Sequence, residues 1–422
     1  MWFWGWVLIF QANADLDGLA KEFVQLTLDL GQHDAYLVDA YYGDPELQKL
    51  AESEKKPLDD LAQSTKKLLK RLDSLKGLKG EELKRWTFLR AQVRALRSRA
   101  EFLQGKKLSF DEEAAMVYDA KPPHYDDAHF QKALDELSLL LPGEGSLTER
   151  LSAFKAKVIV PSIKLDAVFR AAINEARSRT RRHIELPQEE NFEVEYVKDQ
   201  PWSAYNWYKG NFHSLIQVNV DYPISIDRII DLACHEGYPG HHVFNALVEQ
   251  DLVRQRGWVE YSVYPLFSPQ SLIAEGSANY GIQVVFPAQD RLTFERDVLY
   301  PLAGLDPQLA EPYLKIQALM HTLNYAGNEA ARQFLAGNWD APTTSSYLQK
   351  YTLMDPARAD QRVRFIERYR SYVINYNLGQ DQVAEALNAA CLKGADACWK
   401  AFENLLRMPP IPSQLAGNAK DQ

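Results

Sequence analysis

An amphipathic helical period dominates the chain from about Asp15 to Arg182 and limits this stretch to a mainly helical fold. In residues 57–76, leucines recur near one helix face at Leu58, Leu61, Leu68, Leu69 and Leu72. Residues 80–104 repeat the pattern with Trp86, Leu89, Val93, Leu96 and Phe102. We therefore predict an N-terminal helical region over residues 15–185, within a chain of 422 residues that has room for more than one such region.

The pattern changes after the first 185 residues. Residues 191–202 and 212–225 alternate apolar and polar side chains, as half-buried strands do. Ser225 then offers an N-cap for an apolar helix over residues 226–236, and helical patterns continue to the end of the chain. We predict a mainly α fold, with one small antiparallel sheet next to the helix at 226–236, and a second region spanning residues 186–422.

The composition is that of a globular protein, with 46% hydrophobic residues, 25% charged residues and a net charge of −9. Two basic stretches, residues 66–71 and 177–182, lie in helical patterns beside acidic residues, which favours solvated helix faces over a nucleic-acid patch. No stretch approaches the roughly 20 apolar residues that cross a bilayer. We expect no nucleic-acid partner and no integral membrane segment in the mature chain, while the oligomeric state stays open.

Residues 1–14 resemble the end of a secretory signal peptide. A short apolar core precedes Ala-Asn-Ala at residues 12–14, an A-x-A cleavage pattern, although the usual positive n-region is missing. Cys391 and Cys398 are within reach of a small-loop disulfide, which suits an oxidising compartment. We predict an exported protein of the periplasm or cell envelope. If residues 1–14 are a terminal helix packed on the body, a cytoplasmic location follows.

The strongest chemical signal is the run His235-Glu236-Gly237-Tyr238-Pro239-Gly240-His241-His242. A His-Glu pair at the end of an apolar helix begins many zinc peptidase sites, where a second histidine one turn later binds the same ion. Pro239 occupies that position here, and on a straight helix His241 would lie about 9 Å farther along the axis. Proline removes a backbone donor and glycine tolerates unusual dihedrals. We predict that Pro239 and Gly240 break the helix and return His241 or His242 to the metal.

A third ligand is expected from a second helix. Glu275 lies among the small residues of the segment 272–280, which let two helices approach closely. Two histidines and one glutamate leave a fourth position for water, as in catalytic rather than structural zinc sites. Glu236 would take a proton from that water as it attacks a carbonyl. The alternative is that the histidines only cap and pack helix ends.

Residues 235–242, HEGYPGHH, resemble the HExxPGH signature of the bacterial DUF885 family of zinc-peptidase-like proteins. Residues 274–281, AEGSANYG, are similar to that family's EGWAxY motif, which supplies Glu275. Residues 38–47 and 375–380 are similar to its entry and closing segments. The resemblance implies a mainly helical, gluzincin-like protein that uses Zn2+ to cleave peptides.

The family signature ends at its first histidine after the glycine, which favours His241 over His242 as ligand. His242 would then face the substrate or support a ligand. Ser277 stands where the family usually has tryptophan, residues 370–372 replace a usual Pro-Gly-Gln, and Asn375 replaces a serine. We interpret the chain as a divergent branch, whose substrate does not follow from the resemblance.

Three further side chains are predicted around the substrate. An oxyanion needs a hydrogen-bond donor opposite the metal, and we assign this role to Tyr376, with Arg370 next. The alternatives are a core aromatic and a solvated helix charge. Residues 217–221 are expected to form an edge strand to which an extended peptide adds, with Asn219 near the metal helix. An ordinary buried strand is the alternative.

Three functions remain in contention. The first is a zinc metallopeptidase that uses water attack. The second is a metal-dependent hydrolase of a non-peptide amide or ester, which would use the same four residues. The third is a non-catalytic metal-binding module, which the presence of Glu236 disfavours because such a module needs no base beside its ligand.

Overall fold

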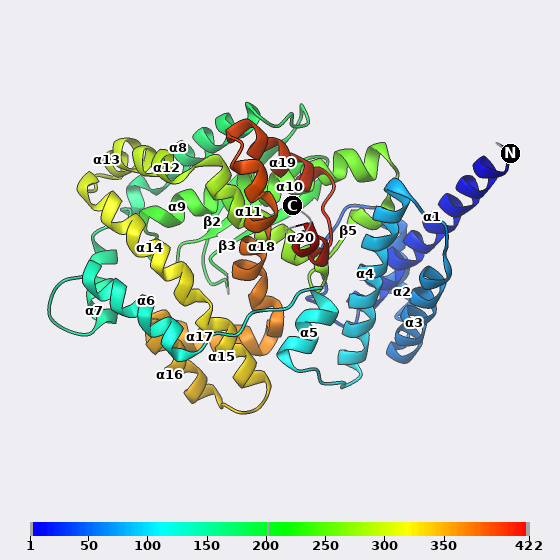
Figure 1. Ribbon diagram of the computed structural model, residues 1–422, viewed down its shortest axis with the longest axis horizontal. Helices are drawn as coiled ribbons and strands as arrows, with labels where there is room; N and C mark the ends of the chain where they lie inside the picture. The colour runs from blue at the N-terminus through cyan, green and yellow to red at the C-terminus, as the bar shows by residue number, and fades with distance from the viewer. Residues whose placement is uncertain (1–2, 201, 419–422) are drawn as a thin grey trace.

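The computed structural model describes residues 3–200 and 202–418, and most of them lie in helices (Figure 1). Helix accounts for 69% and strand for 8% of the protein, which confirms the predicted mainly α fold. Buried hydrophobic side chains form one cluster that runs from Leu16 to Leu415. The regions on either side of residue 186 therefore share a core.

Helices fill the predicted N-terminal region. Their bounds are α1 (Phe3–Gly31), α2 (Pro45–Glu54), α3 (Leu58–Ser74), α4 (Gly80–Leu103), α5 (Phe110–Val117), α6 (Asp127–Leu140), α7 (Leu147–Ala156) and α8 (Ser162–Arg181). Helix α3 buries Leu61, Leu68 and Leu72, as its period predicts. Residues 3–14 of the predicted signal segment begin α1, and residues 1 and 2 lie outside the described part of the chain.

The predicted sheet is present and follows α8. It consists of β2 (Asn191–Val197), β3 (Ala204–Gly210) and β4 (His213–Asn219) in the order β2-β4-β3. Strands β3 and β4 are antiparallel, whereas β2 and β4 are parallel, so the sheet is mixed. A separate antiparallel ladder joins β1 (Val38–Tyr41) to β5 (Val263–Pro265).

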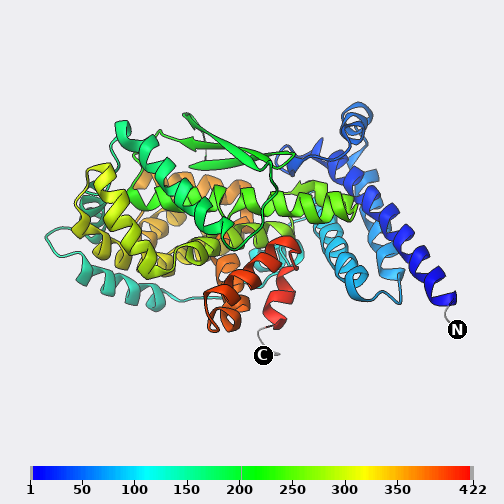
Figure 2. The same cartoon turned by 90° about the horizontal axis from the view of Figure 1, so that it is seen from above.

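The prediction of an edge strand over residues 217–221 is wrong, because β4 lies at the centre of its sheet. Ile216 and Val218 are buried on one face of β4, and this alternation is the same for a central strand and an edge strand. The edges are β2 and β3. Figure 2 shows the sheet lying across one side of the helical body.

Helices occupy most of the remaining chain. The elements from the start of the first histidine helix to the helix that carries Glu275 are α9 (Ile226–Leu232), the π-helical turn η1 (Ala233–Gly237), α10 (His241–Val248), the π-helical η2 (Glu249–Gln255), the 3-10 turn η3 (Val259–Ser262) and α11 (Pro269–Val285). After these come α12 (Ala288–Phe294), η4 (Glu295–Leu299), α13 (Tyr300–Ala303), η5 (Pro307–Leu309), α14 (Ala310–Asn324), α15 (Ala326–Leu335) and α16 (Ala341–Thr352). The last are α17 (Pro356–Tyr369), η6 (Arg370–Val373), α18 (Ile374–Cys391), α19 (Ala395–Arg407) and α20 (Pro412–Asn418).

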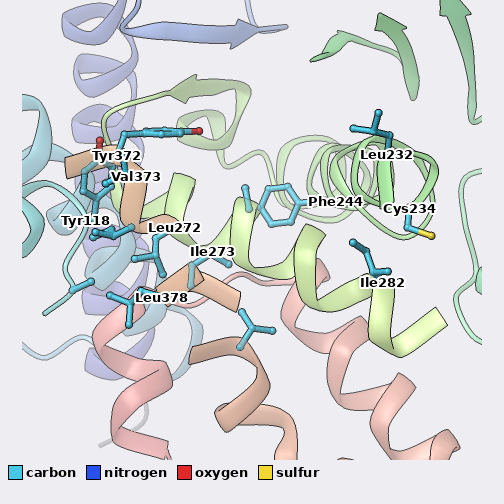
Figure 3. Packing of buried hydrophobic residues seen from close by; sticks show 14 of the residues in the cluster. Tyr118, Leu232, Cys234, Phe244, Leu272, Ile273, Ile282, Tyr372, Val373 and Leu378 are labelled. Carbon is cyan, nitrogen blue, oxygen red and sulfur yellow. The ribbon is translucent and has the colours of Figure 1, made fainter. Parts of the chain in front are cut away.

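Helices α11 and α18 make a close backbone contact at two glycines. A Cβ atom on Gly276 would lie 2.4 Å from the carbonyl carbon of Gly379, and one on Gly379 would lie 2.7 Å from the carbonyl oxygen of Leu272. Figure 3 shows buried hydrophobic side chains on both helices, among them Leu272 on α11 and Leu378 on α18. The small residues therefore fix the position of Glu275 on α11 relative to Tyr376 on α18.

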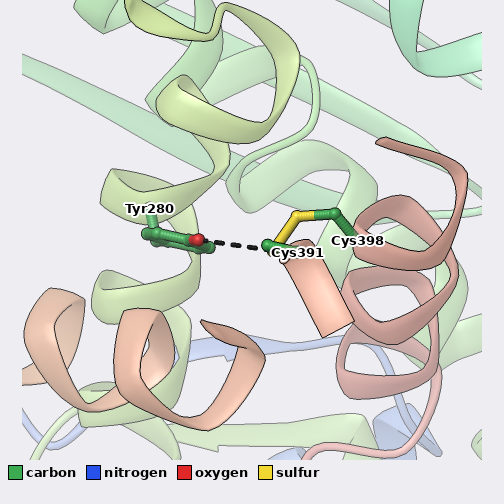
Figure 4. Close-up of a disulfide and its surroundings, with 3 residues drawn as sticks. All are labelled: Tyr280, Cys391 and Cys398. Carbon is green, nitrogen blue, oxygen red and sulfur yellow. Dashed lines mark hydrogen bonds between the residues drawn. A yellow bond between two sulfur atoms is a disulfide. The ribbon is translucent and has the colours of Figure 1, made fainter. Parts of the chain in front are cut away.

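The predicted disulfide between Cys391 and Cys398 is present and joins the end of α18 to α19 (Figure 4). The hydroxyl of Tyr280 lies 3.6 Å from the sulfur of Cys391. Cys234 is a free, buried thiol.

Candidate metal centre

The helix that carries the first histidine is broken where the sequence predicts. Helix α9 passes into the π-helical turn η1, in which one extra residue is inserted per turn, and the chain then goes through a cis Tyr238–Pro239 peptide. The amide of Gly240 donates a hydrogen bond to the carbonyl of Cys234 at 2.9 Å. Helix α10 restarts at His241. Residues 238–240 therefore fold back against the preceding turn, η1.

Gly240 is required for this fold-back. A Cβ atom at this position would lie 1.8 Å from the carbonyl oxygen of His235 and 2.4 Å from that of Cys234. No real Cβ contact is that short, so a side chain cannot be added without opening the turn. The close backbone approach brings His241 beside His235.

The fold-back assembles a compact group of ligand-type atoms. Nitrogen or oxygen atoms of His235, Glu236 and His241 all lie within 4.8 Å of one another. The two imidazole rings are perpendicular, with centroids 4.6 Å apart. From α11, Oε2 of Glu275 lies 3.2 Å from Nε2 of His235 and 3.7 Å from Nε2 of His241. The four residues singled out in the sequence therefore converge.

Polar neighbours orient these side chains. Oδ1 of Asn279 lies 2.9 Å from Nδ1 of His235, and Nδ2 of Asn279 donates to the carbonyl of Tyr376 at 2.8 Å. Because an amide oxygen can only accept, Nδ1 carries the hydrogen and Nε2 faces Glu275. The hydroxyl of Tyr372 donates to Oε1 of Glu275 at 2.8 Å. Neither Asn279 nor Tyr372 was predicted, because no motif in the sequence indicates these contacts.

The charges of the group suit a cation at its centre. Burial would raise the pKa of Glu275, but contacts with His235 and His241 outweigh burial and hold this pKa well below its usual range. Burial would lower the pKa of His241, but Glu275, Glu236 and Asp39 together raise it to about 9. Oε2 of Glu275 is buried and accepts no hydrogen bond from the described residues. A carboxylate oxygen left without a donor beside two Nε2 atoms fits the coordination of a metal ion.

Asp39 joins this group from strand β1 and was not predicted. The hydroxyl of Tyr205 on β3 donates a hydrogen bond to its carboxylate. Burial raises the pKa of Asp39 to about 6, and the charges of His241, Glu275 and Glu236 also act on it. Asp39 lies in the entry segment 38–47, but nothing in the sequence distinguishes it from the other acidic residues there.

Tyr376 lies near the group, as predicted. Its side chain is partly buried, and burial together with the charge of Glu275 raises the pKa of its phenol well above the usual value. The charge of Glu236 acts in the same direction. At neutral pH this phenol keeps its proton and remains a hydrogen-bond donor.

Of the two roles predicted for His242, the structure contradicts facing the substrate and agrees with support of the turn that carries His241. The ring of His242 is fully buried, with Nδ1 2.9 Å from the hydroxyl of Ser214 and Nε2 3.0 Å from Oε2 of Glu190. The hydroxyl of Tyr238 donates to the same carboxylate oxygen at 2.6 Å. Because the two residues are adjacent on α10, His241 and His242 point in different directions. Glu190 thus anchors the residues on both sides of the Pro239-Gly240-His241 turn.

Two other predicted site residues have structural roles. The side chain of Asn219 donates to the carbonyls of Gln200 and Trp202 in the β2–β3 loop and accepts from the amide of Asp221, so its hydrogen bonds hold these two neighbouring loops together. Arg370 donates to Glu113 at 2.5 Å and to the carbonyl of Leu108 at 3.0 Å. The predictions that Asn219 binds substrate and that Arg370 stabilises an oxyanion are therefore wrong.

The Glu190→Gln variant is expected to change how stability depends on pH. Burial alone would raise the pKa of Glu190, but hydrogen bonds with His242, Tyr238 and Arg177 lower it to about 2. A carboxylate with a lowered pKa stabilises the fold above its unfolded pKa, and this contribution is lost as the pH falls from about 4.5 to 2. The shift corresponds to at most about 3 kcal/mol.

Chemical denaturation of the metal-free protein at several pH values measures this contribution. The difference in unfolding free energy between wild type and Glu190→Gln should shrink as the pH falls from 4.5 to 2. The exposed Glu189→Gln variant is the matched control and should show a constant difference. A constant difference for Glu190→Gln as well would contradict the assigned contacts.

No family model and no curated protein matches the chain. Among solved structures, "the putative lipoprotein from Colwellia psychrerythraea" matches with a TM-score of 0.53 over 89% of this chain and 68% of that chain, at 14% sequence identity. A likeness at this identity concerns the fold alone. Within the described residues, no helix is both long and apolar enough to cross a membrane. What the chain shares with this neighbour is its mainly helical architecture.

Proposed function

We propose that the protein is a zinc-dependent hydrolase that cleaves peptide bonds. The observation that carries this proposal is the convergence of His235, His241 and Glu275 on one point, with Glu236 beside them. Two imidazoles and one carboxylate form a donor set that suits zinc and leaves a coordination position open. The same proposal includes membership of the DUF885 family, because the resemblance to that family rests on the same motifs.

In this proposal each side chain has a distinct role. A bound zinc ion would make water acidic enough to lose a proton near neutral pH and would polarise a substrate carbonyl. Glu236 is buried next to the ligands, and its carboxylate takes the proton from water and passes it to the leaving amine. The phenol of Tyr376 donates a hydrogen bond to the oxyanion that develops on the carbonyl. Asn206 donates to the backbone carbonyl of Glu236 at 2.7 Å and holds the base against strand β3.

A peptide is the substrate that this site favours over another amide or ester. Within the described residues, β3 has a ladder partner on one side only. Its unpaired edge offers backbone groups to an extended chain, which would add as a further strand. Because Asn206 ties β3 to Glu236, a peptide on this edge would pass next to the base.

The same proposal includes export from the cytoplasm. The disulfide between Cys391 and Cys398 requires an oxidising compartment to persist. The Colwellia psychrerythraea protein that shares this architecture is named as a "putative lipoprotein", which agrees with a location in the cell envelope. The apolar segment at the start of α1 would act as the targeting signal.

Metal analysis combined with a peptide-library screen tests the proposal. The purified protein should bind one zinc ion per chain and should cleave peptides, and both properties should be lost in His235→Ala and Glu275→Ala. His321→Ala is the matched control, because His321 binds Asp381 away from the metal group. A protein that binds zinc but cleaves no peptide would support a metal-binding module. A protein without zinc affinity would overturn the proposal.

The Tyr376→Phe variant is expected to keep its zinc and to lose about 10²- to 10³-fold in kcat, as when one oxyanion donor is removed elsewhere. Phenylalanine retains the aromatic packing, so KM and the melting temperature should change little. Steady-state kinetics with zinc-loaded protein measure the effect. Unchanged kcat would show that Tyr376 is only a packing residue.

A further inference from the structure

Helix α19 packs against the turn that brings His241 to His235. A Cβ atom on Gly281 of α11 would lie 3.0 Å from Cγ of Pro239 and 3.1 Å from Cζ of Phe402 on α19. The ring of Pro239 and the tip of the Phe402 ring therefore fill the space that glycine leaves on α11. Phe402 is fully buried, so this contact is closed to solvent. Helix α19 thus supports the fold-back turn without contributing a ligand.

A disulfide fixes the end of α19 that carries this contact. Cys398 lies in the first turn of α19, four residues before Phe402, so both side chains are on the same side of the helix. Its bond to Cys391 joins this turn to the end of α18. On α11, the residue before Gly281 is Tyr280, whose hydroxyl lies 3.6 Å from the sulfur of Cys391 (Figure 4). The disulfide therefore meets α11 next to the residue that Phe402 contacts.

The other end of α19 is held independently of the disulfide. Arg407 pairs with Asp251 at 2.9 Å and donates to the carbonyl of Glu185 at 2.8 Å. Residues 392–396, between the two cysteines, are exposed, and both cysteines are only partly buried. A soluble reductant can therefore reach the disulfide. Its reduction would free the first turns of α19, while the helix stays attached at its C-terminal end.

We propose that the disulfide positions the metal turn through Phe402, so that the oxidised protein binds zinc more tightly than the reduced protein. This inference rests on the proposed function and adds its regulation, because the site is completed only after export. The two thiols give up two protons and two electrons when the bond forms, and an external disulfide accepts them and leaves as two thiols. Groups that orient metal ligands without binding the metal typically change metal affinity by about 10- to 100-fold.

Zinc titration of wild type in both redox states tests the proposal. The oxidised protein is prepared with oxidised glutathione and the reduced protein with a phosphine, because dithiol reductants bind zinc themselves. Reduction should lower zinc affinity by about 10-fold, at the lower end of the range for indirect support. The double variant Cys391→Ser with Cys398→Ser should show the lower affinity under both conditions. Because it lacks both cysteines, this variant also excludes zinc held by their reduced thiols.

Substitution of Phe402 tests the contact itself. Phe402→Ala should lower the zinc affinity of the oxidised protein by about 10-fold, and Phe402→Leu should restore most of it. Phe130→Ala on α6 is the matched control, because Phe130 is equally buried but packs against Tyr125 and Tyr351. It should lower the melting temperature by a comparable amount and keep wild-type zinc affinity.

Equal zinc affinity in oxidised and reduced wild type would overturn this inference while the proposed zinc site stands. This comparison needs no substitution, so it does not depend on whether Phe402→Ala folds. An equal loss of zinc affinity in Phe402→Ala and Phe130→Ala would also overturn the inference, since Phe402 would then act through stability alone. If oxidised wild type binds no zinc, the proposed function itself fails.

Discussion

The Glu236→Gln variant is expected to bind zinc as tightly as wild type and to lose about 10²- to 10⁴-fold in kcat, the range attributed to general acid–base catalysis. Glutamine has nearly the shape of glutamate but cannot accept a proton near neutral pH. The contact that holds this residue would survive, because Asn206 donates to the backbone carbonyl of Glu236 rather than to its carboxylate. Metal content and single-turnover kinetics of the purified variant measure the two effects separately.

Two comparisons sharpen this test. Glu193→Gln, an exposed substitution on strand β2, should leave both zinc content and kcat unchanged. Glu275→Gln should lose zinc instead, because an amide oxygen is a poorer ligand than the carboxylate that lies between the two histidines. If Glu236→Gln lost zinc and Glu275→Gln retained it, the roles of ligand and base would have to be exchanged.

Helices whose apolar side chains recur with the helical period could be predicted from the sequence. Leu61, Leu68 and Leu72 recur with the helical period and are buried, because only one face of α3 meets the core. The position of β4 could not be predicted in this way. An alternating pattern shows that one face is buried, but it does not show which strands lie on either side.

The site was predictable where neighbouring residues carry the chemistry. Pro239 and Gly240 indicate a break, and the break returns His241 to His235. The sequence could not show which way His242 turns, because that depends on Glu190, which is 52 residues away and whose carboxylate binds the ring. Asp39 was missed for the same reason. Its role follows from where β1 lies in the fold, and no local spacing encodes that position.

The Gly240→Ala variant is expected to lose the metal site while most of the fold persists. The added Cβ would meet two backbone carbonyl oxygens, at 1.8 Å from His235 and 2.4 Å from Cys234, and backbone atoms cannot move aside as a flexible side chain can. The turn must open, which separates His241 from His235. We expect a loss of about 3 kcal/mol in stability, at the upper end for overpacking. Zinc affinity should fall by at least about 100-fold, because one of three ligands is displaced.

Zinc titration and thermal unfolding of the metal-free protein measure these two effects. Gly327→Ala is the matched control, since a Cβ at Gly327 in α15 meets no atom within 4 Å and alanine favours a helix. It should keep full zinc affinity and equal or exceed the stability of wild type. Wild-type zinc affinity in Gly240→Ala would mean that the two imidazoles meet without the close backbone approach at Gly240. The link between the helix break and the metal centre would then be wrong, even if the ligands themselves were correct.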